Sequence, residues 1–230
     1  MRNLVNFTIM EPLVHDEDYF EKQLKLVLLG ETSTGKTCIV SRFCQNEFCR
    51  QYYPTYGVDF VLHRQEIRNG KNVTLIIWDV SGQSLNSTML ENYVYGAHII
   101  LLVYDITNAA SFIRVNDWLA ALRKLQMDSS PNIALIANKS DMEHQRSVSM
   151  DKHIKFANEN SLSSHSISAR TGENVKLTIQ KICAERLGLK LSRVEQEVQQ
   201  SVVKAEIVTT TQNQVQPTYH PTPSTICSIQ

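Results

Sequence analysis

The sequence lacks an excess of charge of either sign. Lysine and arginine together number 23, aspartate and glutamate also number 23, and the formal net charge of the 230 residues is zero. A neutral chain has no long-range electrostatic field that would attract nucleic acid or an anionic membrane. Composition therefore disfavours nucleic-acid binding, and any membrane contact has to come from something other than bulk charge.

Cysteines at metal-binding spacing are also absent. An odd number of cysteines without a CxxC pair argues against a zinc site and against a disulfide framework, and it favours a reducing compartment. The five positions are Cys38, Cys44, Cys49, Cys183 and Cys227.

Long apolar segments are missing too. The longest run, 99–104, is far shorter than the roughly 20 residues that a membrane-spanning helix needs. The N-terminus carries no apolar signal-peptide region. We therefore expect a cytoplasmic protein.

What the chain does contain divides it into three parts. Residues 1–22 are rich in acidic residues and follow no helical or strand period, so we expect an acidic, poorly ordered extension. Residues 23–188 alternate short apolar runs with helix-length segments, which predicts one globular domain. Residues 189–230 become rich in Thr, Gln, Pro and Ser, the composition of a flexible tether.

The central part has the pattern of an α/β fold. Strands are expected at 24–29, 58–67, 73–78, 99–104, 133–137 and, more weakly, 164–168. The Asn69-Gly70 dipeptide predicts a hairpin between the second and third strands, which makes one strand antiparallel. Helices are expected at 36–44, 89–95, 109–126, 151–160 and 175–187, with Gly188 ending the last one. The prediction is a six-stranded, mostly parallel sheet with one antiparallel strand, flanked by helices on both faces.

A phosphate-binding motif follows the first predicted strand. The strand ends at Gly30, and Gly35-Lys36-Thr37 then opens the first helix, which gives the full spacing of a P-loop. Glycines let the main-chain N–H groups curl around phosphates, the helix N-terminus adds partial positive charge, and Lys36 reaches the outer phosphates. We assign nucleotide binding to Gly30, Glu31, Thr32, Ser33, Thr34, Gly35, Lys36, Thr37 and Cys38.

A second motif selects the base. A P-loop alone does not separate ATPases, nucleotide kinases and GTPases, but Asn138-Lys139-Ser140-Asp141 follows the strand at 133–137. The Asp141 carboxylate can accept both the N1–H and the exocyclic amino group of guanine, a pair that adenine lacks. Lys139 can lie across the base, while Asn138 ties this loop to the phosphate loop. Taken alone the tetrapeptide could be an Asn/Asp turn, and its position at a strand end gives it meaning.

With these motifs the chain resembles the Ras superfamily of small GTPases over 24–188, and the Rab family most of all. The resemblance implies a P-loop GTPase fold that binds GTP, GDP and Mg²⁺. It places Phe48 on the guanine edge and gives the second guanine loop to Ser168, Ala169 and Arg170. It makes Thr37 and Thr55 ligands of Mg²⁺, with Asp79 acting through a water. Gly82 senses the γ-phosphate, and Gln83 is the catalytic residue that orients the attacking water.

The same resemblance implies a surface for partners. Gly57-Val58-Asp59-Phe60 matches a Rab signature, and Phe60, Trp78 and Tyr93 match three aromatics through which Rab proteins contact effectors. At each position alone, core packing is an equally good explanation. The implied partners are an exchange factor, a GTPase-activating protein, effectors and a prenyl-binding carrier, and the implied state is a monomer that acts in membrane trafficking.

Several residues depart from the family pattern. Thr32 and Ser81 add atoms beside the attacking water, which predicts slow hydrolysis without an activating protein. Tyr56 and the segment 84–86 also differ from ordinary Rab sequences, and Arg170 replaces a usual lysine. Two alternatives to a cycling switch stay open. One is a nucleotide-locked interaction protein that acts as a scaffold, and the other is a P-loop kinase with a small acceptor, against which Asp141 argues.

The last four residues, with Cys227 fourth from the end, fit a prenylation motif whose terminal glutamine favours farnesyl. This ending makes the chain resemble the divergent, farnesylated Rab branch numbered twenty-eight. A single prenyl chain anchors only marginally, and neither a second acyl site nor a basic patch is visible in the tail. We therefore expect reversible attachment to the cytosolic face of a membrane.

Overall fold

The structure is a computed structural model that describes residues 22–68, 71–125 and 130–189. Four predictions lie outside these residues: the acidic extension, the turn at Asn69-Gly70, the C-terminal tether and lipidation of Cys227. None of the helices in the described ranges combines the length and the apolar surface that crossing a bilayer requires.

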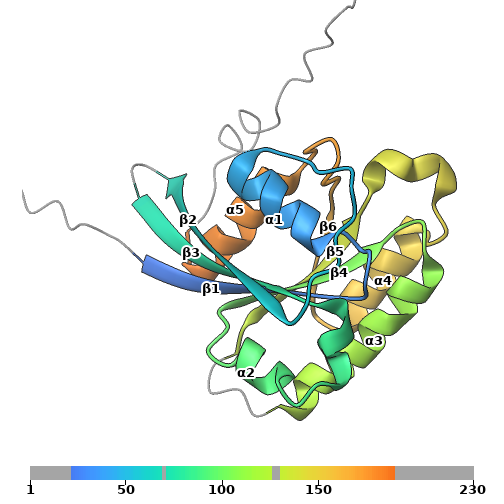
Figure 1. Cartoon of the computed structure of the whole chain (residues 1–230), viewed down its shortest axis with the longest axis horizontal. Helices are drawn as coiled ribbons and strands as arrows, with labels where there is room; N and C mark the ends of the chain where they lie inside the picture. Colours follow the sequence, from blue (N-terminus) through green and yellow to red (C-terminus); the bar gives the residue numbers. More distant parts are fainter. Residues whose placement is uncertain (1–21, 69–70, 126–129, 190–230) are drawn as a thin grey trace, which may run out of the picture.

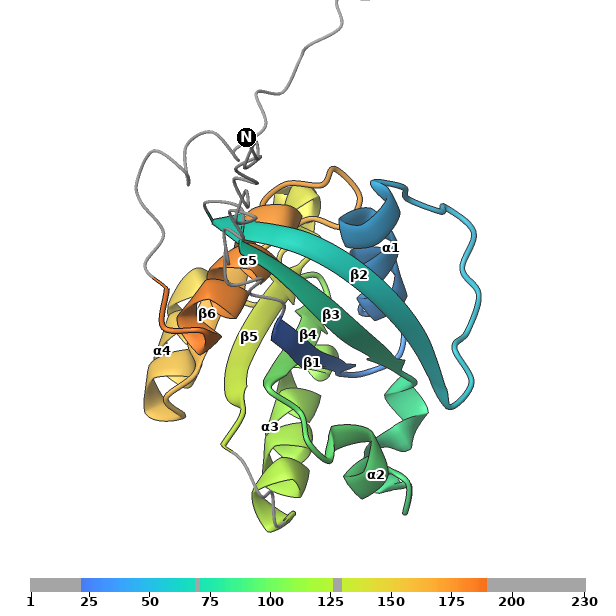
Figure 2. The same cartoon turned by 90° about the vertical axis from the view of Figure 1, so that its left-hand side faces the viewer.

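One six-stranded sheet forms the centre of the domain, with strand order β2-β3-β1-β4-β5-β6 (Figures 1 and 2). The strands are β1 Lys22–Leu29, β2 Val58–Arg68, β3 Lys71–Val80, β4 Ile99–Asp105, β5 Asn132–Asn138 and β6 Ser163–Ser166. β2 pairs with β3 antiparallel, and every other neighbouring pair is parallel. The predicted fold class, with one antiparallel strand in a mostly parallel sheet, is confirmed.

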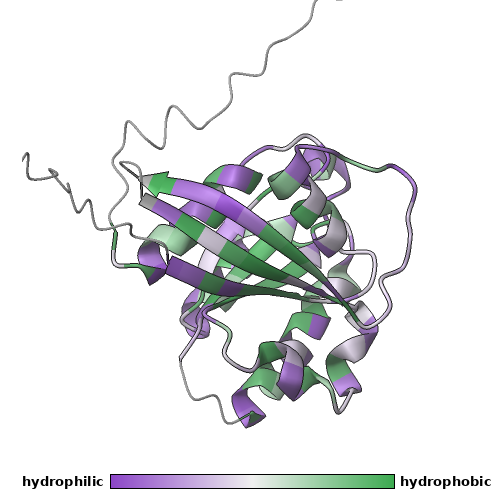
Figure 3. Cartoon of the chain, turned by 60° about the vertical axis from the view of Figure 1, so that its left-hand side comes forward, coloured by the Kyte–Doolittle hydropathy of each residue, from purple (hydrophilic) through white to green (hydrophobic). Residues whose placement is uncertain are grey.

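Helices cover both faces of the sheet (Figure 1). They are α1 Lys36–Gln45, α2 Leu90–Val94, α3 Ala109–Lys124, α4 Met150–Glu159 and α5 Val175–Arg186. Apolar residues of α1 and α5 pack on one face of the sheet, and those of α2, α3 and α4 pack on the other. Because both faces are covered, all of β4 is buried, which explains its uninterrupted apolar sequence. Figure 3 shows this hydrophobic character concentrated in the central strands.

Two short 3₁₀ helices were not expected from the sequence: η1 Gly82–Asn86 and η2 Ser140–Gln145. Each follows directly on a strand end, where the chain leaves the sheet. β6 ends at Ser166, two residues before the predicted end, so Ile167 and Ser168 already belong to a loop. These differences fall at the edge of the sheet where the candidate site lies.

Candidate nucleotide-binding site

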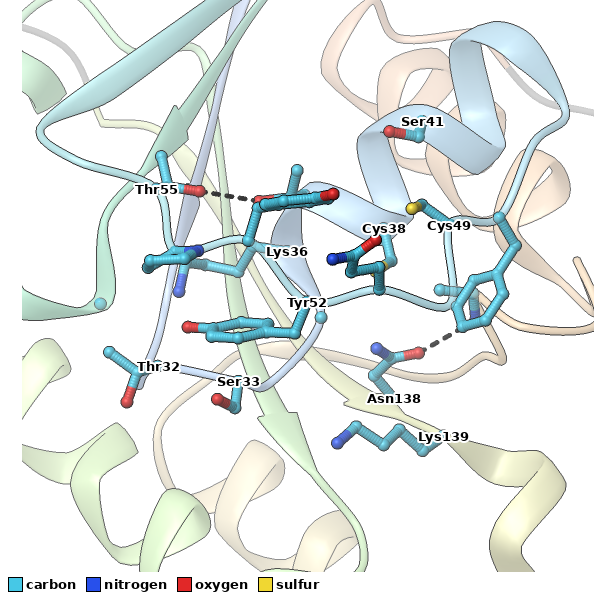
Figure 4. A pocket seen from close by; sticks show the side chains of 18 of the residues that line it. Thr32, Ser33, Lys36, Cys38, Ser41, Cys49, Tyr52, Thr55, Asn138 and Lys139 are labelled. Carbon is cyan, nitrogen blue, oxygen red and sulfur yellow. Dashed lines mark hydrogen bonds between the residues drawn. The ribbon is translucent and has the colours of Figure 1, made fainter.

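The candidate site lies where the chain leaves the C-terminal ends of the parallel strands, the usual place for ligands in open α/β sheets. Loops after β1, β3 and β5 meet the segment between α1 and β2 around a cavity of about 630 Å³ (Figure 4). The predicted residues that line it are Thr32, Ser33, Gly35, Lys36, Thr37, Cys38, Phe48, Thr55, Gly82, Gln83, Asn138, Lys139, Asp141, Ala169 and Arg170.

Two glycines of the phosphate loop leave no room for a side chain. Gly30 has φ 143°, and a Cβ there would clash with the main-chain oxygen of Val103 in β4. Gly35 has φ 90°, and a Cβ there would lie 2.5 Å from Nδ2 of Asn138. Only glycine accepts such conformations without strain, so the loop approaches both neighbours as closely as its main chain allows.

The Lys36 ammonium group is buried inside the phosphate loop. Its Nζ donates hydrogen bonds to the main-chain oxygens of Gly30, at 2.8 Å, and Glu31, at 3.0 Å. Burial lowers the pKa of Lys36 to about 8, although the carboxylates of Asp79 and Glu31 oppose the shift. Burial removes water from the charged ammonium group, which is unfavourable. A phosphate anion beside Lys36 would offset this loss and stabilise the charged form.

Three oxygen-bearing side chains converge at the N-terminus of α1. The Thr37 hydroxyl donates to Oδ2 of Asp79 and lies 3.0 Å from the hydroxyl of Thr55, the contact dashed in Figure 4. Burial raises the pKa of Asp79, against the lowering effects of Thr37 and Lys36. Asp79 Oδ1 is buried and has no hydrogen-bond partner within the described residues. Hydroxyls and a carboxylate with an unpaired oxygen are the donor set that Mg²⁺ prefers, so these residues fit the ion.

The segments on either side of this point contact each other. The main-chain N–H of Ser81 donates to the oxygen of Gly57 at 2.9 Å, which joins the end of β3 to the start of β2. Gly82 packs on the phosphate loop so closely that a Cβ there would lie 2.7 Å from the carbonyl carbon of Glu31 and nearer still to the amide nitrogen of Thr32. The Ser81 hydroxyl accepts from the main-chain N–H of Gln83 at 3.4 Å. Gln83 is thereby placed at the phosphate end of the cavity.

Asn138 joins three loops at the other end of the cavity. Its Nδ2 donates to the main-chain oxygen of Thr34 at 2.8 Å, and its Oδ1 accepts from the amide of Ala169 at 3.1 Å. Asn138 is buried, as expected of a side chain whose polar atoms are paired with main chain. The sequence-based expectation that it ties its loop to the phosphate loop agrees with this geometry.

Asp141 faces the cavity and is held from behind. Ser168 donates from Oγ to Asp141 Oδ1 at 2.6 Å, and the Arg170 guanidinium lies 3.7 Å from Oδ2. Lys139 has a left-handed backbone with φ 69°, and its Nζ pairs with Asp105 at 2.6 Å. The carboxylate that should read the base is therefore held in place by side chains of the loop after β6.

Five of the residues predicted to bind nucleotide or metal do not line the cavity, and four of them support its walls. Gly30 and Thr34 lie within the phosphate loop, Asp79 lies behind Thr37, and Ser168 lies behind Asp141. Glu31 points away and pairs with Arg114 of α3 at 3.1 Å.

Sequence reasoning missed part of the lining. The missed residues are Ser41, Cys49, Arg50, Gln51, Tyr52, Tyr53, Pro54, Tyr56, Ser81 as a wall residue, and Met142. The sequence could have indicated most of these residues. Phe48 and Thr55 were both expected to face the site, so the segment between them has to cross it.

The three predicted partner-binding aromatics form a cluster outside the cavity. Phe60 and Trp78 meet edge to face with ring centroids 4.4 Å apart, and the Tyr93 ring lies 6.4 Å from that of Trp78. The Phe60 side chain is 59% exposed although it is aromatic. Lys25 Nζ lies 3.5 Å from the Trp78 ring centroid, which adds a cation–π contact. An exposed aromatic backed by packed rings suits a partner surface better than a core.

Comparisons with known proteins agree with this geometry. The sequence pattern of the Ras family matches residues 25–187. Ras-related protein Rab-28 of Caenorhabditis elegans is 36% identical over 84% of this chain and 79% of its own length. Ras-related protein Rab-3 of the same organism is 35% identical over 71% of this chain and 74% of its own. Ras-related protein Rab-13 of Canis lupus familiaris is 34% identical over 68% and 76%.

Proposed function

Because the chain belongs to the Ras family of small GTPases, with Rab proteins among its relatives, we propose that its GTP-bound form recruits effector proteins in membrane trafficking and that hydrolysis ends this state. The chain is a GTPase and a guanine-nucleotide-binding switch. We also propose how this chain senses the nucleotide and which surface it presents to partners.

One observation carries the proposal. The Thr37 hydroxyl contacts both Thr55, which lies in the loop before β2, and Asp79, which lies just before Gly82 and Gln83. An ion and a γ-phosphate bound at this point would contact both loops at once. Loss of the γ-phosphate would then release both loops together, which is the known basis of switching by order and disorder.

The residues around this point divide the work of hydrolysis. A bound Mg²⁺ would neutralise charge that develops on the phosphates, and Thr37, Thr55 and Asp79 would hold it. Lys36 would exchange its loop carbonyls for phosphate oxygens. Gln83, whose main-chain N–H bonds to the Ser81 hydroxyl, would orient the attacking water with its side chain.

The opposite end of the cavity would select guanine. Asp141 offers two carboxylate oxygens to the N1–H and amino group of the base, and Lys139 and Phe48 contribute the walls beside it. The kinase alternative is not favoured, because a carboxylate at Asp141 can accept from the N1–H and amino group of guanine, a donor pair that adenine lacks, and Ser168 holds that carboxylate at the cavity.

A specific observation favours slow hydrolysis, and with it the scaffold alternative. Gly82 already touches the main chain of Thr32, and Ser81 is buried beside them. By resemblance Thr32 and Ser81 stand where family members often carry a smaller residue, and both line the cavity, so each adds atoms near the place where a water would attack. We propose that hydrolysis is slow until an activating protein rearranges this region.

Membrane attachment and partners complete the proposal. A domain over 23–188 would carry an acidic extension at 1–22 and a tether at 189–230, and the tether would end in a single farnesyl group on Cys227. One chain gives reversible binding, so a prenyl-binding carrier would hold a cytoplasmic pool. An exchange factor, an activating protein and effectors at Phe60, Trp78 and Tyr93 would act on a monomer.

The test is nucleotide binding followed by turnover. Calorimetry of the purified chain with Mg²⁺ should show tight binding of GTP and GDP, and a large excess of ATP should fail to compete. Phosphate release in a single turnover should be slow for the wild type and abolished in Gln83→Leu. It should become faster when a cell fraction that contains a GTPase-activating protein is added to the wild type. Absence of any GTP binding with Mg²⁺ present would refute the switch. Fast phosphate release without an activating protein would refute the proposal that intrinsic hydrolysis is slow.

A further inference from the structure

Arg42, in the last turn of α1, reaches the loop that follows β6. Its Nε donates to the main-chain oxygen of Ala169 at 3.0 Å, and its Nη2 donates to the oxygen of Arg170 at 2.7 Å. Figure 2 shows α1 beside this orange-coloured loop. No sequence motif marks Arg42, because its partners lie 127 and 128 residues away in the chain.

The Ala169 peptide is held from both sides. Asn138 accepts from its amide at 3.1 Å, and Arg42 donates to its carbonyl oxygen. Hydrogen bonds from a charged donor are roughly twice as strong as those between neutral groups. Ala169 is 3% exposed, so few water molecules compete for these bonds. The loop that should contact guanine is thus clamped by one neutral and one charged side chain.

The same guanidinium also reaches the opposite wall. Arg42 Nη1 donates to the main-chain oxygen of Asn46 at 2.8 Å. Asn46 ends α1 in a left-handed conformation with φ 58°, and its own amide bonds back to the Arg42 oxygen at 3.1 Å. Two residues later comes Phe48, which lines the cavity. Arg42 therefore connects the two segments between which a base would lie.

The stem of Arg42 is packed as well as its head. Gly172 has φ 87°, and a Cβ there would lie 3.3 Å from Arg42 Cδ. The rigid planar fork of arginine can serve three carbonyl oxygens at fixed angles, whereas a lysine ammonium is a single point donor. The site is thus built for arginine and not for a generic cation.

We infer that Arg42 is a positioning residue for guanine, which sets how long the nucleotide stays bound and how strictly the base is read. The inference rests on the proposed function, since it assigns Arg42 to the same pocket. Arg42 acts through the main chain of Ala169 and Arg170 and through the segment that carries Phe48. Loosening that loop would also loosen Ser168, whose hydroxyl holds Asp141.

The experiment uses the full chain with Mg²⁺ and GDP that carries a fluorophore on its ribose. Dissociation of the labelled GDP is measured after addition of excess unlabelled GDP. Affinities of GDP and inosine diphosphate are then compared by competition, because hypoxanthine lacks the amino group that Asp141 should accept. The variants are Arg42→Ala and Arg42→Lys. Arg123→Ala is the matched control, since Arg123 makes one exposed bond to Asn160 far from the cavity.

Arg42→Ala should release labelled GDP about tenfold faster than wild type, and the preference for GDP over inosine diphosphate should fall at least about threefold. Arg42→Lys should lie between, and Arg123→Ala should match wild type. A release rate within about twofold of wild type, or equal weakening of both nucleotides, would overturn the inference, because a merely structural role lowers both affinities alike.

Two further comparisons separate a variant that fails to fold from a failure of the inference. If Arg42→Ala does not fold, Arg42→Lys carries the same comparison, with a reduced but unequal effect on the two nucleotides. If the wild type itself does not bind labelled GDP, the proposed function fails. If the wild type binds and the Arg42 variants behave like it, only the role of Arg42 is lost.

Discussion

The side-chain amide of Asn138 donates to the main-chain oxygen of Thr34 across 2.8 Å, and this one bond joins loops 104 residues apart in the chain. The carbonyl of the same amide accepts from Ala169. The phosphate loop and both base loops therefore share a buried connector. Movement of the phosphate loop can be transmitted to both base loops through Asn138.

Replacing Asn138 by alanine should affect stability and binding together. Asn138→Ala leaves the Thr34 oxygen and the Ala169 amide unpaired inside the protein, and each unpaired buried group costs about 1–3 kcal/mol. We expect the free energy of unfolding to fall by about 2 kcal/mol or more and GDP affinity to fall at least about tenfold. Urea unfolding and competition binding measure the two effects.

The control for this change is Asn116→Ala on the exposed side of α3. The Asn116 amide makes one long bond, 3.4 Å, to the oxygen of Ile113. This variant should unfold within about 0.5 kcal/mol of wild type, as surface substitutions do, and keep its GDP affinity. If the two variants have the same free energy of unfolding and the same GDP affinity, the hydrogen bonds of Asn138 contribute neither to stability nor to binding.

The buried Lys36 predicts a pH dependence in nucleotide-free protein. The pKa of Lys36 falls from its ordinary value of 10.5 to about 8 in the fold because of burial. Between these two values the unfolded chain binds more protons than the folded chain, so stability rises with pH through this window. From pH 8 to pH 9.5 the gain from Lys36 should be about 1–2 kcal/mol.

Lys36→Met removes this gain, because methionine carries no proton. Urea unfolding of nucleotide-free wild type and variant at pH 8 and 9.5 isolates it, since other titrating groups cancel in the difference. Bound GDP should abolish the dependence in the wild type, because phosphate anions restore the charged form. Parallel pH profiles for the two nucleotide-free proteins would contradict the burial of a cation at this position.

Gly82 should tolerate no larger residue, because the phosphate loop leaves no space there for a side chain. In Gly82→Ala the new Cβ would overlap the main chain of Glu31 and Thr32, so the segment that holds Gln83 has to move. We expect phosphate release in a single turnover to slow at least about tenfold, because misplacing the group that orients water costs rate steeply.

Gly96 supplies the opposite case. It has φ 65°, but a Cβ there would meet nothing within 4 Å. Gly96→Ala should therefore lower the melting temperature through backbone strain of about 1 kcal/mol and leave phosphate release unchanged. The pair separates crowding at the phosphate loop from a general effect of adding a methyl group.

The sequence predicted most of the fold because its signals are local. Apolar runs bounded by turns placed the six strands, and the glycines at Gly30 and Gly35 placed the phosphate loop beside Lys36. The pairing of Asn138 with the phosphate loop followed from where such motifs meet in α/β sheets, whereas the order of the strands came only from the structure.

The clamp formed by Arg42 could not be predicted in the same way. An arginine in the last turn of an amphipathic helix is usually a solvated residue, and its role depends on which main-chain oxygens the folded chain brings within reach. The unpaired oxygen of Asp79 and the packing of Gly82 on Thr32 are likewise properties of the assembled site. Motifs therefore predicted the chemistry of the site, and only the structure revealed its supports.

Farnesylation of Cys227 remains a prediction. Cys227→Ser, expressed in a eukaryotic cell, should lose the prenyl mass in intact-protein mass spectrometry and move entirely to the soluble fraction. Cys44→Ser changes a half-buried cysteine that does not line the cavity, and it should keep both the prenyl mass and the membrane pool. Since one prenyl chain binds only marginally, wild type should divide between the two fractions. Complete, salt-resistant membrane binding of wild type would show that a second anchor exists.

The exposed ring of Phe60 gives the sharpest test of the partner surface. Phe60 and Leu62 occupy alternate positions of β2, and they are 59% and 73% exposed. Phe60 differs from Leu62 in resting edge to face on Trp78. Leu62→Ala should change the free energy of unfolding by no more than about 1 kcal/mol, and Phe60→Ala by about 2 kcal/mol because it also loses its contact with Trp78.

Binding to partners should separate the two positions. Proteins retained by the GTP-loaded but not the GDP-loaded chain are identified first, and the same proteins are then scored on each variant. Phe60→Ala should reduce their retention at least about tenfold, since a packed aromatic in the middle of an interface contributes about 2 kcal/mol or more. Leu62→Ala should reduce it far less. If Leu62→Ala costs as much as Phe60→Ala, binding follows the whole outer strand and not the aromatic cluster.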